Sequence, residues 1–459
     1  MSPRLDQLSL RRVAIWGYGK EGQAALRLLR QQYPQKKIGL IVTPEEAERW
    51  HFELDPLLEV ITDAPSPGVF GNYQIVIKSP GISPYAHQRA MEWAHFRGTR
   101  FISGSALWFA QHGEDKTVCI TGTKGKSTTS ALTAHLLQAG GTATLLAGNI
   151  GTPLLDVLEP DPAPEVYVVE LSSFQCFDFA GVPAIATVLN LSPEHLDWHG
   201  SEQQYYSDKL KILAEGRADV AVLNAADERL RAMTHGIERK VWFNDPEHWH
   251  ARGDSVWHGG EKLIDLAATQ LIGAHNASNI AAACTMIELL GVEPRRVVDA
   301  LRAFRPLPHR LQRLGERRGR HFIDDSISTT PEATLAALSS LNGQALAVLV
   351  GGHDRGIDWR DFAERVLAHP PRAIVGVGAH GARIVDTLAT QWSGLAGSAH
   401  PALAQASDLK AAIARAEELT PLGGTILLSP GAPSFDAFKD YAERGQRFAE
   451  WAGFETTRS

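Results

Sequence analysis

Residues 118–129 read Val-Cys-Ile-Thr-Gly-Thr-Lys-Gly-Lys-Ser-Thr-Thr, which predicts a buried strand, a glycine turn and the start of a helix. Glycines in such a turn let backbone N–H groups surround a phosphate chain, and the helix N-terminus adds partial positive charge. Lys126 can reach the outer phosphates, and the Ser127 hydroxyl can bind Mg²⁺. Two residues separate Gly122 from Gly125, whereas the standard phosphate loop has four at this place. The stretch therefore predicts ATP binding through a shortened loop, with a plain glycine turn as the alternative.

The composition limits the class of protein. A chain of 459 residues is too long for one core and predicts about three domains. An apolar fraction of 44% is typical of globular proteins, and the net charge of −7 argues against sequence-independent nucleic-acid binding. The three cysteines predict no disulfide framework, and the N-terminus lacks the apolar core of a signal peptide. We therefore expect a cytoplasmic protein without membrane insertion.

A second glycine turn lies near the N-terminus. Residues 17–22 read Gly-Tyr-Gly-Lys-Glu-Gly after an apolar run and before a helical stretch, which is typical of dinucleotide-binding turns. NAD binding would need an acidic residue at the end of the next strand, but that strand ends in Thr43-Pro44 and the acidic residues Glu45 and Glu46 come later. We expect another nucleotide, or tight helix–strand packing. An NAD-dependent oxidoreductase remains the alternative.

Polar clusters follow several predicted strands in the central third. Glu170 ends an apolar run, where a Mg²⁺ ligand is expected beside a phosphate loop, although a helix-capping role is equally compatible. His195 and His199 are four residues apart, but nearby proline and glycine argue against a paired zinc site and leave one histidine on Mg²⁺ or Mn²⁺. By composition alone, Lys209 reads as a solvated helical lysine.

Strand-like and helical stretches alternate along the chain, which predicts an α/β protein with parallel sheets and helices on both faces. Strands are predicted at 346–350, 373–377 and 425–429, whereas residues 235–260 are polar and irregular and give no clear prediction. We expect three domains, each built on a mainly parallel sheet with flanking helices. They are a Rossmann-like domain at 1–104, a central ATPase-like domain at 105–306 and a Rossmann-like domain at 307–459.

Several motifs, in this order, resemble the Mur ligase family over nearly the whole chain. They are the loop 122–128, Gly-Asn-Ile-Gly at 148–151, Glu-Leu-Ser-Ser-Phe-Gln at 170–175, Glu-His-Leu-Asp at 194–197, the region of Lys209, His-Asn-Ala-Ser-Asn at 275–279, Leu-Pro-His-Arg at 307–310 and Asp-Asp-Ser at 324–326. The most similar members add glutamate to UDP-N-acetylmuramoyl-L-alanine in peptidoglycan synthesis. The resemblance implies an ATP-dependent ligase that works through an acyl phosphate and forms ADP and phosphate. A folylpolyglutamate synthetase shares the ATP loop, but the glycine-rich first domain speaks against it.

The resemblance also implies a role for the residue at each motif position. The catalytic residues would be Lys126, Glu170, His195 and Lys209, and two Mg²⁺ ions would be held by Ser127, Glu170, His195 and Lys209 as a carbamate. ATP would be bound by Gly122, Thr123, Lys124, Gly125, Lys126, Ser127, Thr128, Asn276, Asn279, Arg310 and Asp325. The UDP substrate would be bound by Gly17, Tyr18, Gly19, Lys20, Glu21, Ser79, Gly81, Asn149 and His195, and glutamate by Thr329, Arg355, Ser434 and Tyr441.

The glutamate pocket departs from the pattern of the D-glutamate-adding members. They have Lys-Ala-Thr-Asn after the Asp-Ser pair, where this chain has Ile327 and Ser328, and they have a lysine where this chain has Arg355. Arginine can hold a carboxylate through two hydrogen bonds, whereas lysine acts as a point charge. These differences resemble a branch that adds L-glutamate, which an epimerase then inverts. We expect a monomer that adds L-glutamate, with D-glutamate as the alternative.

Overall fold

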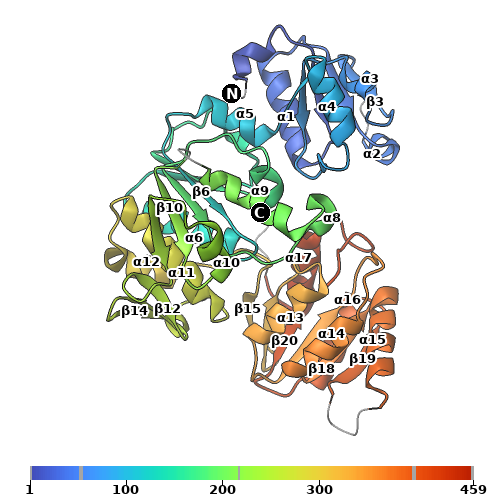
Figure 1. Ribbon diagram of the computed structural model, residues 1–459. Coiled ribbons are helices and arrows are strands. Elements are labelled where there is room, and N and C mark those ends of the chain that lie inside the picture. The colour runs from blue at the N-terminus through green and yellow to red at the C-terminus, as the bar shows by residue number, and fades with distance from the viewer. Residues whose placement is uncertain (1–2, 51–54, 215–217, 395–399, 456–459) are drawn as a thin grey trace. The chain divides into compact units, whose positions relative to one another are not determined.

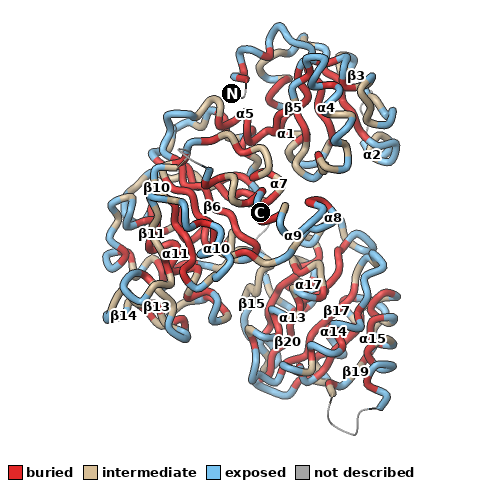
Figure 2. The backbone as a smooth tube through the Cα atoms, viewed as in Figure 1, coloured by how far each residue is buried: buried red, intermediate tan, exposed pale blue. Residues whose placement is uncertain are grey.

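The computed structural model describes residues 3–50, 55–214, 218–394 and 400–455. The chain forms two compact units. The first comprises Met1–Ile264 with Ala277–Leu301, and the second comprises Asp265–Asn276 with Arg302–Ser459. Figure 1 shows the elements of both units, and Figure 2 shows buried strands beneath more exposed helices. No helix within the described ranges is long and apolar enough to cross a membrane.

The first unit begins with a five-stranded parallel sheet in the order β3-β2-β1-β4-β5. Every residue of its strands β1 and β4 is buried, and all of them are apolar except Lys78 at the end of β4, as expected where helices cover both faces. The strands are β1 (Val13–Trp16), β2 (Ile38–Ile41), β3 (Leu58–Ile61), β4 (Ile75–Lys78) and β5 (Arg100–Ile102), and the helices are α1 (Lys20–Gln32), α2 (Pro44–Arg49), α3 (Pro67–Phe70) and α4 (Gln88–Phe96).

A six-stranded parallel sheet follows in the same unit, in the order β11-β10-β9-β6-β8-β7. Its strands are β6 (Thr117–Thr121), β7 (Thr144–Gly148), β8 (Val166–Glu170), β9 (Ile185–Val188), β10 (Val220–Asn224) and β11 (Lys240–Phe243). The helices are α5 (Gly104–Gln111), α6 (Lys126–Ala139), α7 (Ser173–Cys176), α8 (Leu196–His199), α9 (Glu202–Leu210), α10 (Glu228–Met233), α11 (His275–Leu289) and α12 (Val298–Ala303). The segment without a clear prediction forms β11 and part of a small sheet of β12 (Trp249–Arg252), β13 (Ser255–His258) and β14 (Glu261–Asp265), with β12 and β13 antiparallel.

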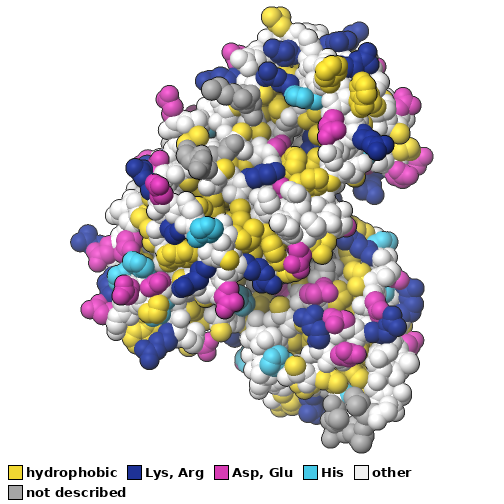
Figure 3. Space-filling model, viewed as in Figure 1, with side chains coloured by type: hydrophobic (Ala, Val, Ile, Leu, Met, Phe, Trp, Pro, Cys, Tyr) yellow, Lys and Arg dark blue, Asp and Glu magenta, His cyan; other side chains and the backbone are white. Residues whose placement is uncertain are grey.

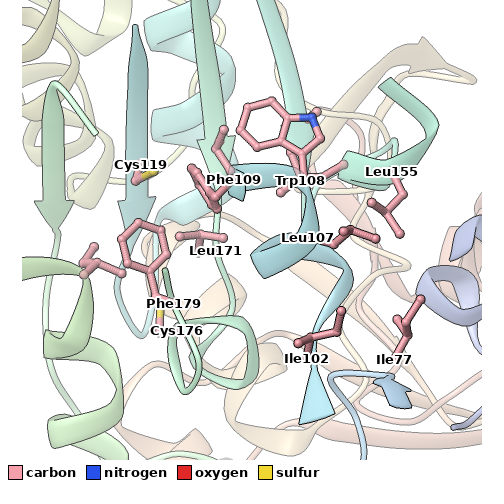
Figure 4. Close-up of a cluster of buried hydrophobic side chains, with 14 of the residues drawn as sticks. Ile77, Ile102, Leu107, Trp108, Phe109, Cys119, Leu155, Leu171, Cys176 and Phe179 are labelled. Atoms are coloured by element: carbon pink, nitrogen blue, oxygen red, sulfur yellow. The ribbon is translucent and has the colours of Figure 1, made fainter. Parts of the chain in front are cut away.

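One hydrophobic core joins the two large sheets of the first unit. In Figure 4, Ile77 and Ile102 from the first sheet lie near Leu107 of α5, and the same cluster contains Trp108 of α5, Cys119 of β6 and Leu171, which directly follows β8. Because buried side chains from both sheets pack in one cluster, residues before and after 104 belong to a single compact unit. The domain limits at 104 and 306 stay predictions.

The second unit contains a six-stranded sheet in the order β15-β16-β20-β17-β18-β19, parallel except for the antiparallel pair β15–β16. Two hydrophobic clusters contain side chains of its strands and helices. The strands are β15 (Gln312–Arg317), β16 (Arg320–Asp324), β17 (Leu346–Val350), β18 (Ala373–Val377), β19 (Ala402–Ala406) and β20 (Thr425–Leu428), and the helices are α13 (Pro331–Ser340), α14 (Arg360–Arg365), α15 (Gly378–Trp392), α16 (Leu409–Leu419) and α17 (Tyr441–Ala452). The predicted α/β class, with mainly parallel sheets and flanking helices, is confirmed.

Candidate functional site

The predicted phosphate loop joins β6 to α6, and both of its glycines are required. Gly122 has φ +153°, and a Cβ there would lie 2.9 Å from Leu189 Cβ. Gly125 has φ +85° and caps α6, and a Cβ there would lie 2.4 Å from Asn279 Oδ1. The Lys126 ammonium donates to the carbonyls of Gly122 at 3.0 Å and of Thr123 at 2.9 Å. The loop therefore has a fixed shape, with its cation held against its own backbone.

Two residues without a role in the sequence prediction brace this loop. The Asn190 side chain accepts from Lys124 N at 2.8 Å and donates to Lys124 O at 2.9 Å. The Tyr205 hydroxyl lies 2.9 Å from Thr123 Oγ1. Asn190 follows β9, which pairs with β6, and Tyr205 precedes Lys209 by four residues on one helix face. These two positions in the sequence were the only features that could have suggested a contact of Asn190 or Tyr205 with the loop.

Lys209 is buried, so the composition-based reading of a solvated lysine is wrong. The residue is 1% exposed, and its ammonium donates to Gly122 O at 2.8 Å, the same carbonyl that accepts from Lys126. Burial, followed by the positive charge of Lys126, lowers the pKa of Lys209 to about 7. A substantial fraction of this amine is therefore neutral near pH 7, as carbamate formation with CO₂ requires.

Glu170 places a buried carboxylate at the carboxyl end of β8, the strand beside β6. Its Oε1 accepts from Asn149 Nδ2 at 2.6 Å, while Oε2 is buried and has no hydrogen-bond partner among the described residues. An unpaired buried carboxylate oxygen is costly and suits a cation. The described part of the chain has no cluster of three or more His, Cys, Asp or Glu side chains that could hold a metal. Mg²⁺ commonly takes one or two carboxylates and completes its shell with water and phosphate oxygens, so Glu170 and Ser127 fit it.

The two histidines of the central segment have different surroundings. The His195 side chain is 48% exposed, the residue has φ +55°, and burial lowers its pKa, so its ring is largely neutral at pH 7. His199 is buried and its Nδ1 lies 2.7 Å from Asp208 Oδ2. His195 is thus available as a neutral ligand, whereas His199 is committed to a structural contact.

A cleft of about 880 Å³ in the first unit collects most of the residues predicted for the UDP substrate. The Gly17 carbonyl accepts from Ser79 Oγ at 2.9 Å, which joins the two loops at the carboxyl ends of β1 and β4. The predicted residues Tyr18 and His195 are not in its lining. Glu46, whose side chain caps the start of α2, also lines the cleft. The predicted residues that do line it are Gly17, Gly19, Lys20, Glu21, Ser79, Gly81 and Asn149.

Glu21 has a second contact that the sequence did not suggest. Its Oε1 accepts from Gln175 Nε2 at 3.0 Å, which ties the first turn of α1 to helix α7. Burial, with a smaller contribution from Asp156, raises the pKa of Glu21 to about 7. The carboxyl group therefore links the two sheets of the first unit as well as lining the cleft.

The remaining predicted ATP residues divide between the units. Asn279 belongs to the first unit, where its Oδ1 accepts from Thr129 Oγ1 at 3.3 Å, and Asn276 belongs to the second. In the second unit, Asp325 is 4% exposed and accepts from Ser429 Oγ at 2.8 Å and Ser328 Oγ at 2.5 Å. Burial raises the pKa of Asp325 to about 6, although these hydrogen bonds and the charge of Arg310 oppose the rise.

Replacing Asp325 with asparagine is expected to change the pH dependence of stability. The folded state favours protonated Asp325 because burial raises its pKa. The resulting stabilisation of the folded state is fully present below the ordinary pKa of 3.8 and is lost as the pH rises through about 6. Asparagine cannot ionise and so does not lose this stabilisation. The unfolding free energy of Asp325→Asn minus that of wild type should therefore be up to about 3 kcal/mol higher above pH 6 than at low pH. Urea-unfolding midpoints of both proteins at pH 4 and pH 8 test this. A variant-minus-wild-type difference that does not change with pH contradicts it.

Three of the predicted glutamate residues, Thr329, Arg355 and Ser434, lie on the loops that follow β16, β17 and β20, and the fourth, Tyr441, begins α17. His353 N donates to Pro433 O at 2.7 Å, which joins the loop of Arg355 to that of Ser434. Gly431 N donates to Ser328 O at 3.1 Å, and Ser326 Oγ donates to Tyr441 O at 2.8 Å. Hydrogen bonds therefore join the loops of Thr329, Arg355 and Ser434 to one another and to the start of α17 at Tyr441.

Arg444 binds two of these loops through hydrogen bonds, and the sequence did not predict this role. It is 3% exposed and donates to Ser326 Oγ at 3.0 Å and to the carbonyls of Ser326 and Ala432 at 2.9 Å each. A Cβ on Gly352 would lie 2.9 Å from Arg444 Nη1. Burial lowers the pKa of Arg444 to about 10, which keeps the guanidinium charged at neutral pH. Only its place one turn into the last helix could have suggested an inward side chain.

Comparisons with known proteins agree with this geometry. Residues 120–287 match the model of the Mur ligase middle domain. The UDP-N-acetylmuramoyl-L-alanine--L-glutamate ligase of Xanthomonas axonopodis pv. citri (strain 306) is 47% identical, with 98% of this chain and 97% of that protein covered. The ligase of the same name from Xylella fastidiosa (strain Temecula1 / ATCC 700964) is also 47% identical, with the same coverage.

Solved structures share the fold. The UDP-N-acetylmuramate-alanine ligase MurC of Thermotoga maritima has a TM-score of 0.58 at 20% identity, covering 96% of this chain and 98% of that chain. MurF ligase of Thermotoga maritima, solved in complex with ADP, has a TM-score of 0.56 at 16% identity, covering 82% and 93%. At these identities the likeness concerns the fold, but the relatives that match along almost their whole length settle the family. The chain belongs to the Mur ligase family.

Proposed function

We propose that the protein joins UDP-N-acetylmuramoyl-L-alanine to L-glutamate through an amide bond while ATP is converted to ADP and phosphate. Relatives bearing the name of this reaction are 47% identical over 98% of the chain. The observation that carries the proposal is the buried group around Gly122 O. There the phosphate loop, Lys126 and the depressed-pKa amine of Lys209 meet within hydrogen-bonding distance.

The side chains divide the work of binding. Lys126 binds the outer ATP phosphates, and the loop 122–128 surrounds the phosphate chain with N–H groups. Ser127 and Glu170 would hold one Mg²⁺, and Glu170, His195 and Lys209, as a carbamate, would hold a second. These ions, when bound, supply positive charge that offsets the charge developing on the transferred phosphoryl group. Asn276, Asn279, Arg310 and Asp325 are the further residues that we propose bind ATP.

Two successive displacements account for the reaction. A carboxylate oxygen of the alanine attacks the γ-phosphorus, the bond to the β,γ-bridging oxygen breaks, and ADP leaves. The amine of glutamate then attacks the acyl carbon, phosphate leaves, and the nitrogen loses its extra proton. This chemistry needs little from side chains beyond placement of three anionic reactants, which is the task of the cleft and the Lys126 charge.

The choice of L-glutamate is supported by the names of the relatives and by the glutamate loops. Ile327 is uncharged where the D-glutamate-adding pattern has lysine, and Arg355 is exposed on the loop joined to that of Ser434. The Arg355 guanidinium can bind one carboxylate of glutamate through two parallel hydrogen bonds. We further propose that the protein acts as a monomer and that an epimerase inverts the added residue.

Phosphate release tests the proposal directly. The enzyme is incubated with ATP, Mg²⁺ and UDP-N-acetylmuramoyl-L-alanine, with L-glutamate and D-glutamate in separate tubes. Release with L-glutamate alone, and L-glutamate recovered by chiral chromatography of the hydrolysed product, is expected. Release with D-glutamate alone would keep the ligase and overturn the stereochemical assignment. Release with neither would overturn the proposed reaction.

A further inference from the structure

Asp208 is a fully buried carboxylate one residue before Lys209 on α9. It accepts from the Tyr85 hydroxyl at 2.8 and 3.0 Å, from Lys211 Nζ at 2.8 Å and from Gln204 Nε2 at 3.1 Å. Because a carboxylate only accepts, the His199 Nδ1 that lies 2.7 Å away carries the proton of that hydrogen bond. Donors from three parts of the chain therefore converge on one side chain.

Asp208 and Lys209 face different parts of the site. Consecutive residues of an α-helix point about 100° apart, so neighbouring side chains reach different partners. Lys209 contacts the phosphate loop at Gly122 O, and Asp208 contacts Tyr85 in the segment after β4. That segment directly follows Ser79 and Gly81, which line the large cleft. The last turn of α9 thus connects the phosphate loop with a wall of the cleft.

The connection extends to the segment that carries Glu170. His199 Nε2 lies 3.0 Å from Ser173 Oγ in α7, which follows β8 and Glu170 by three residues. A parallel contact runs from Ser83 Oγ to Trp198 O at 2.6 Å. Asp208 therefore contacts the cleft wall directly and the Glu170 segment through His199. Its neighbour Lys209 contacts the phosphate loop.

We propose that Tyr85 and Asp208 are positioning residues that couple the UDP-substrate cleft to Lys209 by fixing the last turn of α9. Neither residue touches the reacting atoms. The inference rests on the proposed function for its kinetic consequences, but the coupling itself concerns contacts present in the free protein.

Tyr85→Phe is the sharpest variant. It removes only the hydroxyl and keeps the ring, which packs edge-on against Phe177 and Trp198 at centroid distances of 5.5 and 5.8 Å. Tyr206→Phe is the matched control, because Tyr206 lies on the same helix and its hydroxyl contacts Glu202 at 3.5 Å. Asp208→Asn is the second variant. It keeps the size of the side chain and removes its charge.

Hydrogen–deuterium exchange of the free enzymes tests the coupling without any substrate. In Tyr85→Phe, amides of α9 should exchange about tenfold faster than in wild type, as loss of a hydrogen bond to a charged group implies. Amides of α6 should keep their rates, and Tyr206→Phe should match wild type throughout. Unchanged exchange in α9 of Tyr85→Phe overturns the coupling, whatever reaction the enzyme catalyses.

Steady-state kinetics test the effect on Lys209. If wild type turns over with UDP-N-acetylmuramoyl-L-alanine and L-glutamate, kcat should fall about tenfold in Tyr85→Phe while the KM for ATP stays within about twofold. Because Tyr85 acts through Asp208, adding Tyr85→Phe to Asp208→Asn should lower kcat no further. A Tyr85→Phe enzyme with wild-type kcat, or fully additive losses in the double variant, overturns the positioning role. An inactive wild type instead overturns the proposed function, and the exchange measurement still decides the coupling.

Discussion

Lys209→Ala is expected to lower turnover at least about 1,000-fold, which corresponds to about 4 kcal/mol of lost transition-state stabilisation. The substitution removes the buried amine that donates to Gly122 O and whose pKa is depressed to about 7. In the proposed mechanism this amine becomes an anionic carbamate beside the phosphate loop. Its loss would therefore remove both the proposed metal ligand and the contact with Gly122 O that shapes the loop. Phosphate release under saturating substrates measures the effect.

Chemical rescue separates a carbamate from a plain amine. The Lys209→Ala enzyme gains a buried space into which a short-chain carboxylate such as acetate or propionate fits. Partial recovery with these acids, and none with ethylamine or with bicarbonate alone, is expected if the functional group is anionic. Recovery with ethylamine alone would identify the free amine as the functional form.

Lys240→Ala is the matched control for this experiment. Its ammonium also donates to backbone carbonyls, those of Thr234 at 3.0 Å and His235 at 3.1 Å, but it lies outside the site. Turnover within about twofold of wild type is expected, as for a surface substitution away from functional residues. Full activity in Lys209→Ala would remove Lys209 from the mechanism.

The sequence predicted features that arise from local chemistry. The glycine turn at 122–125 and the strands at 346–350 and 373–377 lie where expected, because an apolar run between turn signals specifies a buried strand by itself. The predicted strand at 425–429 ends one residue earlier, within the usual uncertainty of strand ends. Figure 3 shows acidic and basic side chains interspersed over the face in view.

Features that depend on distant partners could not be predicted. Lys209 is polar and lies on a helix with polar neighbours, so nothing local signals that tertiary packing buries it against Gly122. The small antiparallel sheet containing β12 and β13 lies in a polar segment, where cross-strand pairing stabilises the strands more than their own propensity does. Asp208 and Arg444 likewise gain their roles from partners more than 100 residues away.

Glu170→Gln is expected to lower turnover by a similar factor, at least about 1,000-fold, while leaving the protein as stable or more stable. Glutamine keeps an oxygen to accept from Asn149 Nδ2, and it replaces a buried carboxylate oxygen that has no hydrogen-bond partner within the described ranges. Replacing this buried oxygen, which has no hydrogen-bond partner among the described residues, lowers the desolvation cost of folding, so the thermal midpoint should hold or rise. Removing the anion also removes the group best placed to attract Mg²⁺, so the Mg²⁺ concentration needed for residual turnover should increase.

Glu165→Gln is the matched control, because it makes the same chemical change at a position outside the site. Glu165 lies just before the other end of the same strand, is exposed, and accepts from Ala143 N at 3.1 Å. We expect this control to keep wild-type turnover and Mg²⁺ dependence. A Glu170→Gln enzyme that retained turnover within tenfold of wild type at an unchanged Mg²⁺ requirement would show that Glu170 does not hold the metal. A fall in the thermal midpoint of Glu170→Gln would contradict the stability part of the prediction, because it would show that contacts of the carboxylate stabilise the folded protein.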